Sequence, residues 1–251
     1  MPSSVPKTGP VRPATPTDVS AAIAERRRRE RRRHLGLVGG GAALVLLLAL
    51  ALWLVSFSPV FASKQVRVEG NKLVSTDQVL AAAQVPMGVP LSKLKTGPIG
   101  QRVAVLPPVG GVRVHTKWPS TVVIEVTERV AVYQRLEGTT YESVDAAGVV
   151  FVQGAKRNKS LPLVRTPSVE NRLLADVATV VTNLTPKLVK KLDAVEASGP
   201  DDITVKLTTG QQVLWGSAAD SATKAQVAEA LVAREKFTVF NVASPANPTA
   251  R

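Results

Sequence analysis

The chain contains no cysteine and only two histidines, His34 and His115, in 251 residues. The absence of cysteine excludes disulfides, a thiol nucleophile and cysteine ligands for zinc or iron–sulfur clusters. With two histidines, little is left for metal or acid–base chemistry, so we expect no metal site and no cofactor. The adjacent carboxylates Asp201 and Asp202 follow a Gly-Pro pair and are interpreted as turn residues.

Two catalytic motifs are matched only formally. Residues 92–95 fit the S-x-x-K pattern and residues 95–97 fit K-T-G, both motifs of penicillin-binding enzymes. The two matches share Lys95, whereas in those enzymes the motifs lie far apart in sequence and meet only in the fold. His115 lies in the middle of a predicted strand, and the chain has no G-x-S-x-G turn to supply a hydrolase serine. We therefore predict no catalytic residues and a protein that is not an enzyme.

The stretch of residues 35–57 carries no charge and consists mainly of Leu, Val, Ala and Gly. As a helix rising 1.5 Å per residue it is about 34 Å long, enough to cross a hydrocarbon core of about 30 Å. We interpret it as one transmembrane helix in the lipid bilayer. A cleaved signal peptide with a site at residues 60–62 is the alternative, although its apolar region should be only about 7–15 residues long.

An arginine cluster directly precedes this stretch and comprises Arg26, Arg27, Arg28, Arg29, Arg31, Arg32 and Arg33. The positive-inside bias predicts that residues 1–34, a basic tail expected to be disordered, stay in the cytoplasm. The rest of the chain then lies outside, in a single-pass type II topology. A nucleic-acid interpretation does not explain why the arginines stop where the apolar stretch begins, so no nucleic-acid partner is expected.

After the apolar stretch, the sequence predicts the order β-α-α-β-β. Alternation predicts a strand at 65–69, and Ser75 is a suitable N-cap for a helix at 76–84. A second helix is predicted near 97–106, before two consecutive prolines. Strands at 112–117 and 122–126 follow, joined by a turn at 118–120.

These residues resemble the POTRA domain of the FtsQ/DivIB bacterial cell-division family. The most specific stretch, residues 117–129, reads KWPSTVVIEVTER and is similar to the family signature W-P-x-T/S-V-x-I-x-V-x-E-R. Residues 66–71 match the family's opening strand, while Val130 stands where a proline is usual. The resemblance implies an α+β fold: a single transmembrane helix, a POTRA domain at 58–129 and a mixed, β-rich FtsQ-type domain at 130–251.

The remaining sequence predicts further strands and two more helices. The turn at 145–148 resembles the corresponding turn of the FtsQ/DivIB β domain and joins strands at 141–144 and 149–152. An amphipathic helix is predicted at 220–235, with Lys224 in solvent. The other predicted elements are strands at 131–133, 161–164, 203–207 and 212–215, and a helix around 173–181.

The β-branched and aromatic run at 237–243 predicts a last strand, ended by the prolines that follow. At a sheet edge this strand could accept a strand from another protein, whereas an internal strand would only complete the sheet. The resemblance implies the edge position, because in the FtsQ/DivIB family the FtsB partner adds at the carboxy-terminal strand. The candidate partner-binding residues are Thr238, Val239, Phe240, Asn241, Val242, Ala243 and Ser244.

The resemblance implies a divisome scaffold in the cytoplasmic membrane at the division septum. Its partners would be FtsB/FtsL-like proteins and other membrane components of the divisome. Through them it would link early and late division proteins and help to control septal peptidoglycan synthesis. Two alternatives stay open: a cell-wall hydrolase or transpeptidase with an unrecognised active site, which would turn over substrate, and a POTRA-type chaperone, which would bind unfolded strands of many sequences.

Overall fold

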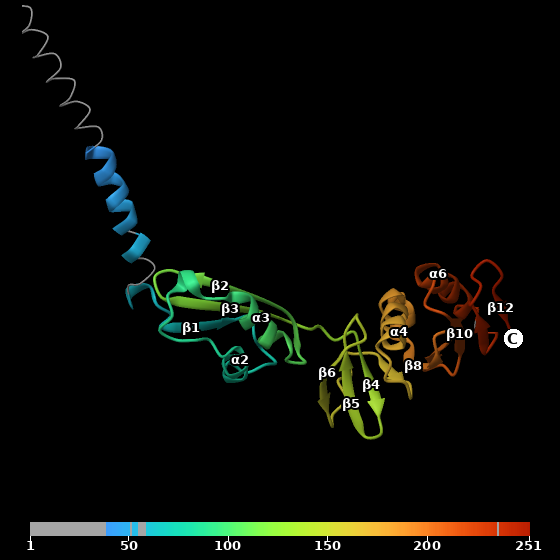
Figure 1. Ribbon diagram of the computed structural model, residues 1–251. Helices are drawn as coiled ribbons and strands as arrows, with labels where there is room; N and C mark the ends of the chain where they lie inside the picture. The colour runs from blue at the N-terminus through green and yellow to red at the C-terminus, as the bar shows by residue number, and fades with distance from the viewer. Residues whose placement is uncertain (1–38, 51, 55–58, 235) are drawn as a thin grey trace, which may run out of the picture.

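The computed structural model describes residues 39–50, 52–54, 59–234 and 236–251. Residues 39–50 and 52–54 are helical, and beyond them two sheets follow one another along an elongated molecule (Figure 1). Within the described ranges, no helix combines the length and hydropathy needed to cross a membrane. The predicted span at 35–57 lies partly outside these ranges, and the arginine cluster lies wholly outside them.

The first sheet has three strands in the order β1-β3-β2, with β1 parallel and β2 antiparallel to β3. The predicted β-α-α-β-β order is confirmed. Its elements are η1 (Pro59–Phe61), β1 (Gln65–Glu69), α2 (Thr76–Ala83), η2 (Leu91–Lys93), α3 (Thr96–Ala104), β2 (Val109–Lys117) and β3 (Thr121–Glu128).

The helices α2 and α3 bury their apolar stripes against this sheet. Ser75 caps α2 as predicted, since its hydroxyl accepts a hydrogen bond from the Gln78 N–H at 3.2 Å. The core is made by apolar side chains from both helices, from β2 and β3 and from the loop before α2, and each buried valine or isoleucine contributes about 1.5–3 kcal/mol. It contains Val74, Val79, Ala83, Ile99, Val103, Val109, Ile124 and Val126.

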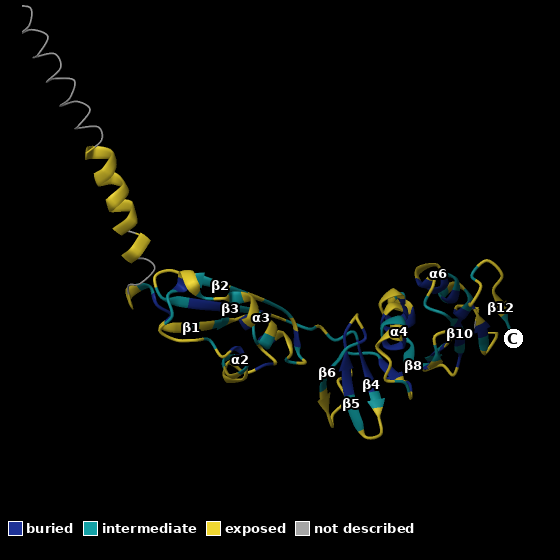
Figure 2. Ribbon diagram, in the orientation of Figure 1, coloured by how far each residue is buried: buried dark blue, intermediate teal, exposed yellow. Residues whose placement is uncertain are grey.

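The second sheet has nine strands in the order β12-β11-β10-β9-β8-β7-β4-β5-β6. Three helices, α4, α5 and α6, contribute to the core against it, so buried residues gather where helices and strands meet (Figure 2). Its elements are β4 (Tyr133–Glu137), β5 (Thr140–Val144), β6 (Val150–Gly154), β7 (Leu163–Arg165), α4 (Asn171–Asn183), α5 (Pro186–Lys190), β8 (Leu192–Gly199), β9 (Asp202–Leu207), β10 (Gln212–Gly216), α6 (Ser221–Val232), β11 (Val239–Asn241) and β12 (Thr249–Ala250).

The helix α6 turns a different face to the core than its sequence predicts. Lys224, expected in solvent, is only 2% exposed, and its Nζ donates a hydrogen bond to the Ser217 carbonyl at 2.9 Å. Burial lowers the pKa of Lys224, while the carboxylates of Asp220 and Asp201 act in the opposite direction. The expectation was wrong because the alanines of α6 lie on several sides of the helix, so its sequence has no distinct apolar stripe.

Candidate functional site

The last predicted strand lies one strand in from the edge of the second sheet. β11 pairs in parallel with β10 and antiparallel with β12, with Phe240 opposite Ala250. The expectation that residues 238–244 form the free edge is therefore wrong. After the turn at 244–247, in which the Asn247 N–H donates to the Ser244 carbonyl, the chain returns and covers β11.

Alternation along β11 divides the candidate residues between two faces of the sheet. Phe240 and Val242 are 0% exposed and belong to the core, so they are not available as anchors for a partner. Val239 and Asn241 lie on the opposite face. The remaining candidates, Thr238, Ala243 and Ser244, are exposed around the strand.

The backbone of β12 supplies the free edge that β11 lacks. Val239 and Arg251 exchange two hydrogen bonds, each with an N···O distance of 3.0 Å. Along an antiparallel pair of strands, residues that exchange two hydrogen bonds alternate with residues whose N–H and C=O point away from the partner strand. The N–H and C=O of Ala250 consequently point away from β11, where an added strand could bind them.

A shallow hollow of about 230 Å³ lies beside this edge, lined by Leu214, Val239, Asn241, Thr249, Ala250 and Arg251. Ligand pockets usually have volumes of about 300–1,000 Å³. The hollow is smaller than these and is of a size to accept a side chain from an added strand. Two of the predicted residues, Val239 and Asn241, line this hollow, and the sequence does not predict the edge residues Thr249, Ala250 and Arg251.

Trp215 is a core residue. Its side chain is 0% exposed, and its Nε1–H donates a hydrogen bond to the Ser221 Oγ at 3.1 Å.

Glu128 and Arg129, the Glu-Arg pair at the end of the signature, both form contacts with other parts of the folded chain. The carboxylate of Glu128 accepts hydrogen bonds from the backbone N–H groups of Lys72, Leu73 and Val74 at 2.7, 2.6 and 3.0 Å. Burial tends to raise the pKa of Glu128, but these three bonds outweigh it and hold the pKa below its usual value. The contact fixes the loop between β1 and α2 against the end of β3.

Replacing Glu128 with Gln should lower the free energy of unfolding by about 1 kcal/mol at pH 7, because a charged acceptor becomes neutral. The folded-state pKa is lowered, so the native contribution is fully present above the unfolded pKa and is lost as the pH falls through the folded one. Urea denaturation at pH 7 and at lower pH measures both effects. A Glu128→Gln variant as stable as the parent at pH 7 would contradict this role.

Arg129 connects the two sheets. Its Nη1 lies 2.6 Å from the Asp145 Oδ2, while its Nε donates to the Pro107 carbonyl at 3.1 Å. The other oxygen of Asp145 accepts from the N–H groups of Ala147 and Val149 at 2.9 and 2.8 Å. The last residue of the POTRA-like signature is thereby joined to the first residue of the β-domain turn, a pairing that sequence spacing alone did not predict.

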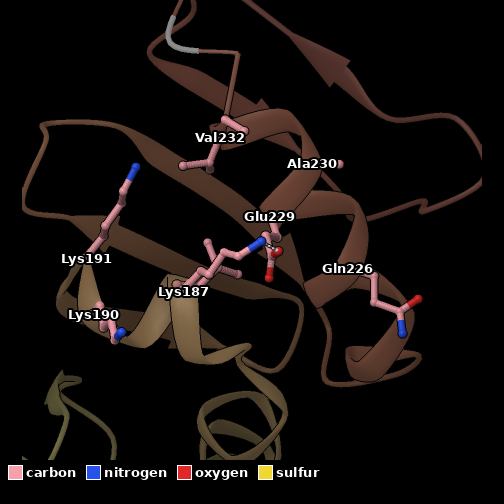
Figure 3. Close-up of a pocket in the computed structure, with 9 residues that line it drawn as sticks. Lys187, Lys190, Lys191, Gln226, Glu229, Ala230 and Val232 are labelled. Atoms are coloured by element: carbon pink, nitrogen blue, oxygen red, sulfur yellow. Dashed lines mark hydrogen bonds and ion pairs between the residues drawn. The ribbon is translucent and has the colours of Figure 1, made fainter.

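A second concave surface lies between α5 and α6 (Figure 3). It has a volume of about 430 Å³, an apolar floor that includes Leu188 and Val232, and a rim carrying Lys187, Lys190 and Lys191. Lys187 donates a hydrogen bond to Glu229 at 2.7 Å, which lowers the pKa of that carboxyl and raises the pKa of the lysine. The sequence predicts no helix at α5, because a proline commonly marks the end of a helix, whereas Pro186 occupies the first position of a new one.

The formal catalytic matches fall on separate structural elements. Ser92 lies in η2, while Lys95 is the N-cap of α3. His115 is half exposed on β2, with its Nδ1 3.8 Å from a carboxylate oxygen of Glu125. In the part of the chain that the structure describes, no three acidic or histidine side chains gather as metal ligands would.

Comparisons with known proteins agree with the POTRA-like and FtsQ/DivIB-like stretches of the sequence. A family model described as "POTRA domain, FtsQ-type" matches residues 61–129, and one described as "Cell division protein FtsQ/DivIB, C-terminal" matches residues 131–243. The chain is 34% identical over 212 residues to the cell division protein FtsQ of Streptomyces venezuelae, covering 80% of this chain and 78% of that protein.

Other relatives and one solved structure extend the comparison. Identity to FtsQ of Streptomyces griseus is 32% over 196 residues, covering 74% of this chain and 94% of that protein. The extracytoplasmic domain of the division protein DivIB from Geobacillus stearothermophilus matches at a TM-score of 0.35 with 12% identity, over 43% of this chain and 93% of that chain. The assignment therefore rests on the sequence comparisons, by which the chain belongs to the FtsQ/DivIB family of cell division proteins.

Proposed function

We propose that the chain is a non-enzymatic scaffold of the division machinery, anchored in the cytoplasmic membrane at the septum by residues 35–57. The helix at 39–50 and 52–54 supports anchoring, because its described residues are exposed although most are apolar (Figure 2). The arginine cluster supports a type II topology with the amino terminus in the cytoplasm. In this arrangement the POTRA domain, 58–129, and the β domain, 130–251, lie outside.

The scaffold binds an FtsB/FtsL-like partner by strand addition at β12. The observation that carries this proposal is the outward direction of the Ala250 N–H and C=O at the end of a nine-stranded sheet. The hollow beside β12 receives a side chain of the incoming strand. By holding this partner, and other divisome membrane proteins through its span and POTRA domain, the chain links early and late division proteins and helps to control septal peptidoglycan synthesis.

Replacing Ala250 with Pro tests this site. Proline removes the outward N–H and points its ring at the incoming strand, while Thr249 and Arg251 keep their bonds to β11. Affinity of the full chain, in detergent, for the extracytoplasmic part of its FtsB-like partner should fall about tenfold or more. Isothermal titration measures this affinity, and the melting temperature should stay unchanged.

Ala250→Ser is the matched control, because serine keeps the backbone N–H and adds only one oxygen atom. It should bind as the parent does. Equal affinity of the proline and serine variants would move the site away from β12. No binding by the parent chain would contradict the proposed partnership itself.

A further inference from the structure

Three large apolar side chains are exposed at one end of the first sheet. Val60 is 55% exposed, Met87 54% and Trp118 49%. Single exposed apolar residues are common on protein surfaces. These three residues differ because all of them lie close to the segment that follows the predicted membrane span. Val60 is part of that segment, and the loops carrying Met87 and Trp118 are bonded to it. We call the three residues the apolar tip.

Hydrogen bonds and a ring contact hold both loops of the tip to residues 61–65. The rings of Phe61 and Trp118 meet edge to face with centroids 5.4 Å apart. The carbonyl of Ser120 accepts from the N–H groups of Lys64 and Gln65 at 2.8 and 3.2 Å. The turn that carries Trp118 is thus fixed to the point where the chain enters the sheet.

The loop that carries Met87 is fixed to the same point. Ser63 donates its N–H to the Val89 carbonyl and accepts from the Gly88 N–H, both at 2.9 Å. The Ser63 hydroxyl also donates to the Pro86 carbonyl at 2.7 Å. Since Ser63 is 1% exposed, these bonds are shielded from water.

Chain length limits how far the tip can lie from the bilayer. Phe61 is four residues beyond residue 57, and a fully extended chain of that length spans at most about 14 Å. The headgroup region on each side of a bilayer is about 5–8 Å thick. Tryptophan concentrates in this region because its ring is apolar while its N–H is polar.

Two lysines stand at the same end of the sheet as the tip. Lys64 precedes β1 and Lys117 ends β2, and both are exposed. The strand partners Gln65 and Lys117 both lie opposite Thr121, which places the two lysines around the Trp118 turn. Ammonium groups beside an apolar patch suit a surface of anionic headgroups above acyl chains.

We propose that the apolar tip inserts into the headgroup region of the membrane and holds the POTRA domain against the lipid surface. This inference rests on the proposed anchoring by residues 35–57. The bilayer is the occupant because the tip is tied within a few residues of the predicted span. The POTRA domain is then oriented as well as tethered, so that its distance from the membrane is fixed.

The chain has three tryptophans, Trp53, Trp118 and Trp215, which allow a direct test. The full chain is reconstituted in vesicles of phosphatidylcholine and phosphatidylglycerol, with and without acyl chains brominated near the headgroup. Bromine quenches tryptophan fluorescence only at contact. The signal of Trp118 is that of Trp53→Phe minus that of the double variant Trp53→Phe/Trp118→Phe, which retains only the buried Trp215.

The brominated lipid should reduce the Trp118 signal at least twofold and leave the Trp215 signal unchanged. Trp53, measured as Trp118→Phe minus the same double variant, reports the anchor separately. Quenching of Trp53 without quenching of Trp118 would overturn the tip proposal and leave the anchoring intact. Absence of quenching at both positions would overturn the anchoring and the tip proposal with it.

Discussion

Replacing Phe240 with Asp should unfold the C-terminal β domain. Phe240 is 0% exposed in β11, between β10 and β12, and packs into the large core. The substitution removes an aromatic ring and buries a carboxylate without a partner, at a cost of more than about 4 kcal/mol. Domains are stable by only about 5–15 kcal/mol, so the cooperative transition of this domain should be weakened strongly or lost. Urea denaturation followed by near-UV circular dichroism measures it.

Thr238→Asp is the matched control, because Thr238 is exposed two residues earlier in the same segment. This variant should unfold as the parent does. If Phe240→Asp kept the parental transition but lost partner binding, Phe240 would lie on the surface, and the pairing of β11 between two strands would be wrong.

Replacing Gly148 with Ala should destabilise the same domain by more than about 3 kcal/mol, the range of severe backbone effects. Gly148 has φ +76°, and a Cβ there would lie 2.6 Å from the Ala175 backbone nitrogen and even closer to the Asn171 carbonyl oxygen. Both atoms belong to the backbone of α4, which cannot move aside without leaving the core. Thermal denaturation of the variant measures the loss.

Two other glycines separate the effect of a positive φ from the effect of the close contact with α4. Gly138 also has positive φ, but a Cβ there meets no atom within 4 Å, so Gly138→Ala should cost only about 1 kcal/mol. Gly154 has neither feature, and Gly154→Ala should change stability by less than about 0.5 kcal/mol. Equal losses at Gly148 and Gly138 would contradict the close approach of the Gly148 turn to α4.

The sequence predicts elements well where the hydrophobic period is unbroken. The strand predicted at 131–133 lies too early in the chain compared with β4, because the charged residues Arg135 and Glu137 interrupt the apolar pattern. In the fold Arg135 is buried, and its guanidinium contacts Glu142 on the neighbouring strand at 2.8 and 2.6 Å. A charge that is neutralised by a residue of another strand is indistinguishable in sequence from a charge in solvent.

The position of the candidate site could not be predicted for a similar reason. The apolar run around Phe240 correctly predicts a strand, but a strand is internal or at an edge according to what pairs with it. The pairing strand β12 spans only Thr249–Ala250 and follows two prolines, which normally indicate the end of a sheet. Gly70 and Gly148 lie in the family-like stretches 66–71 and 145–148, and both have positive φ, a conformation that glycine adopts at little cost.

Hydrogen exchange at the Ala250 backbone amide is the most direct test of strand addition at β12. In the free chain this N–H points away from β11, so it should exchange rapidly with deuterium in nuclear magnetic resonance spectra of the ¹⁵N-alanine-labelled protein. Saturation with the FtsB-like partner should slow its exchange at least tenfold, while exchange at Ala246 in the preceding turn stays unchanged. Binding that leaves Ala250 exchanging as fast as in the free chain would contradict strand addition at β12.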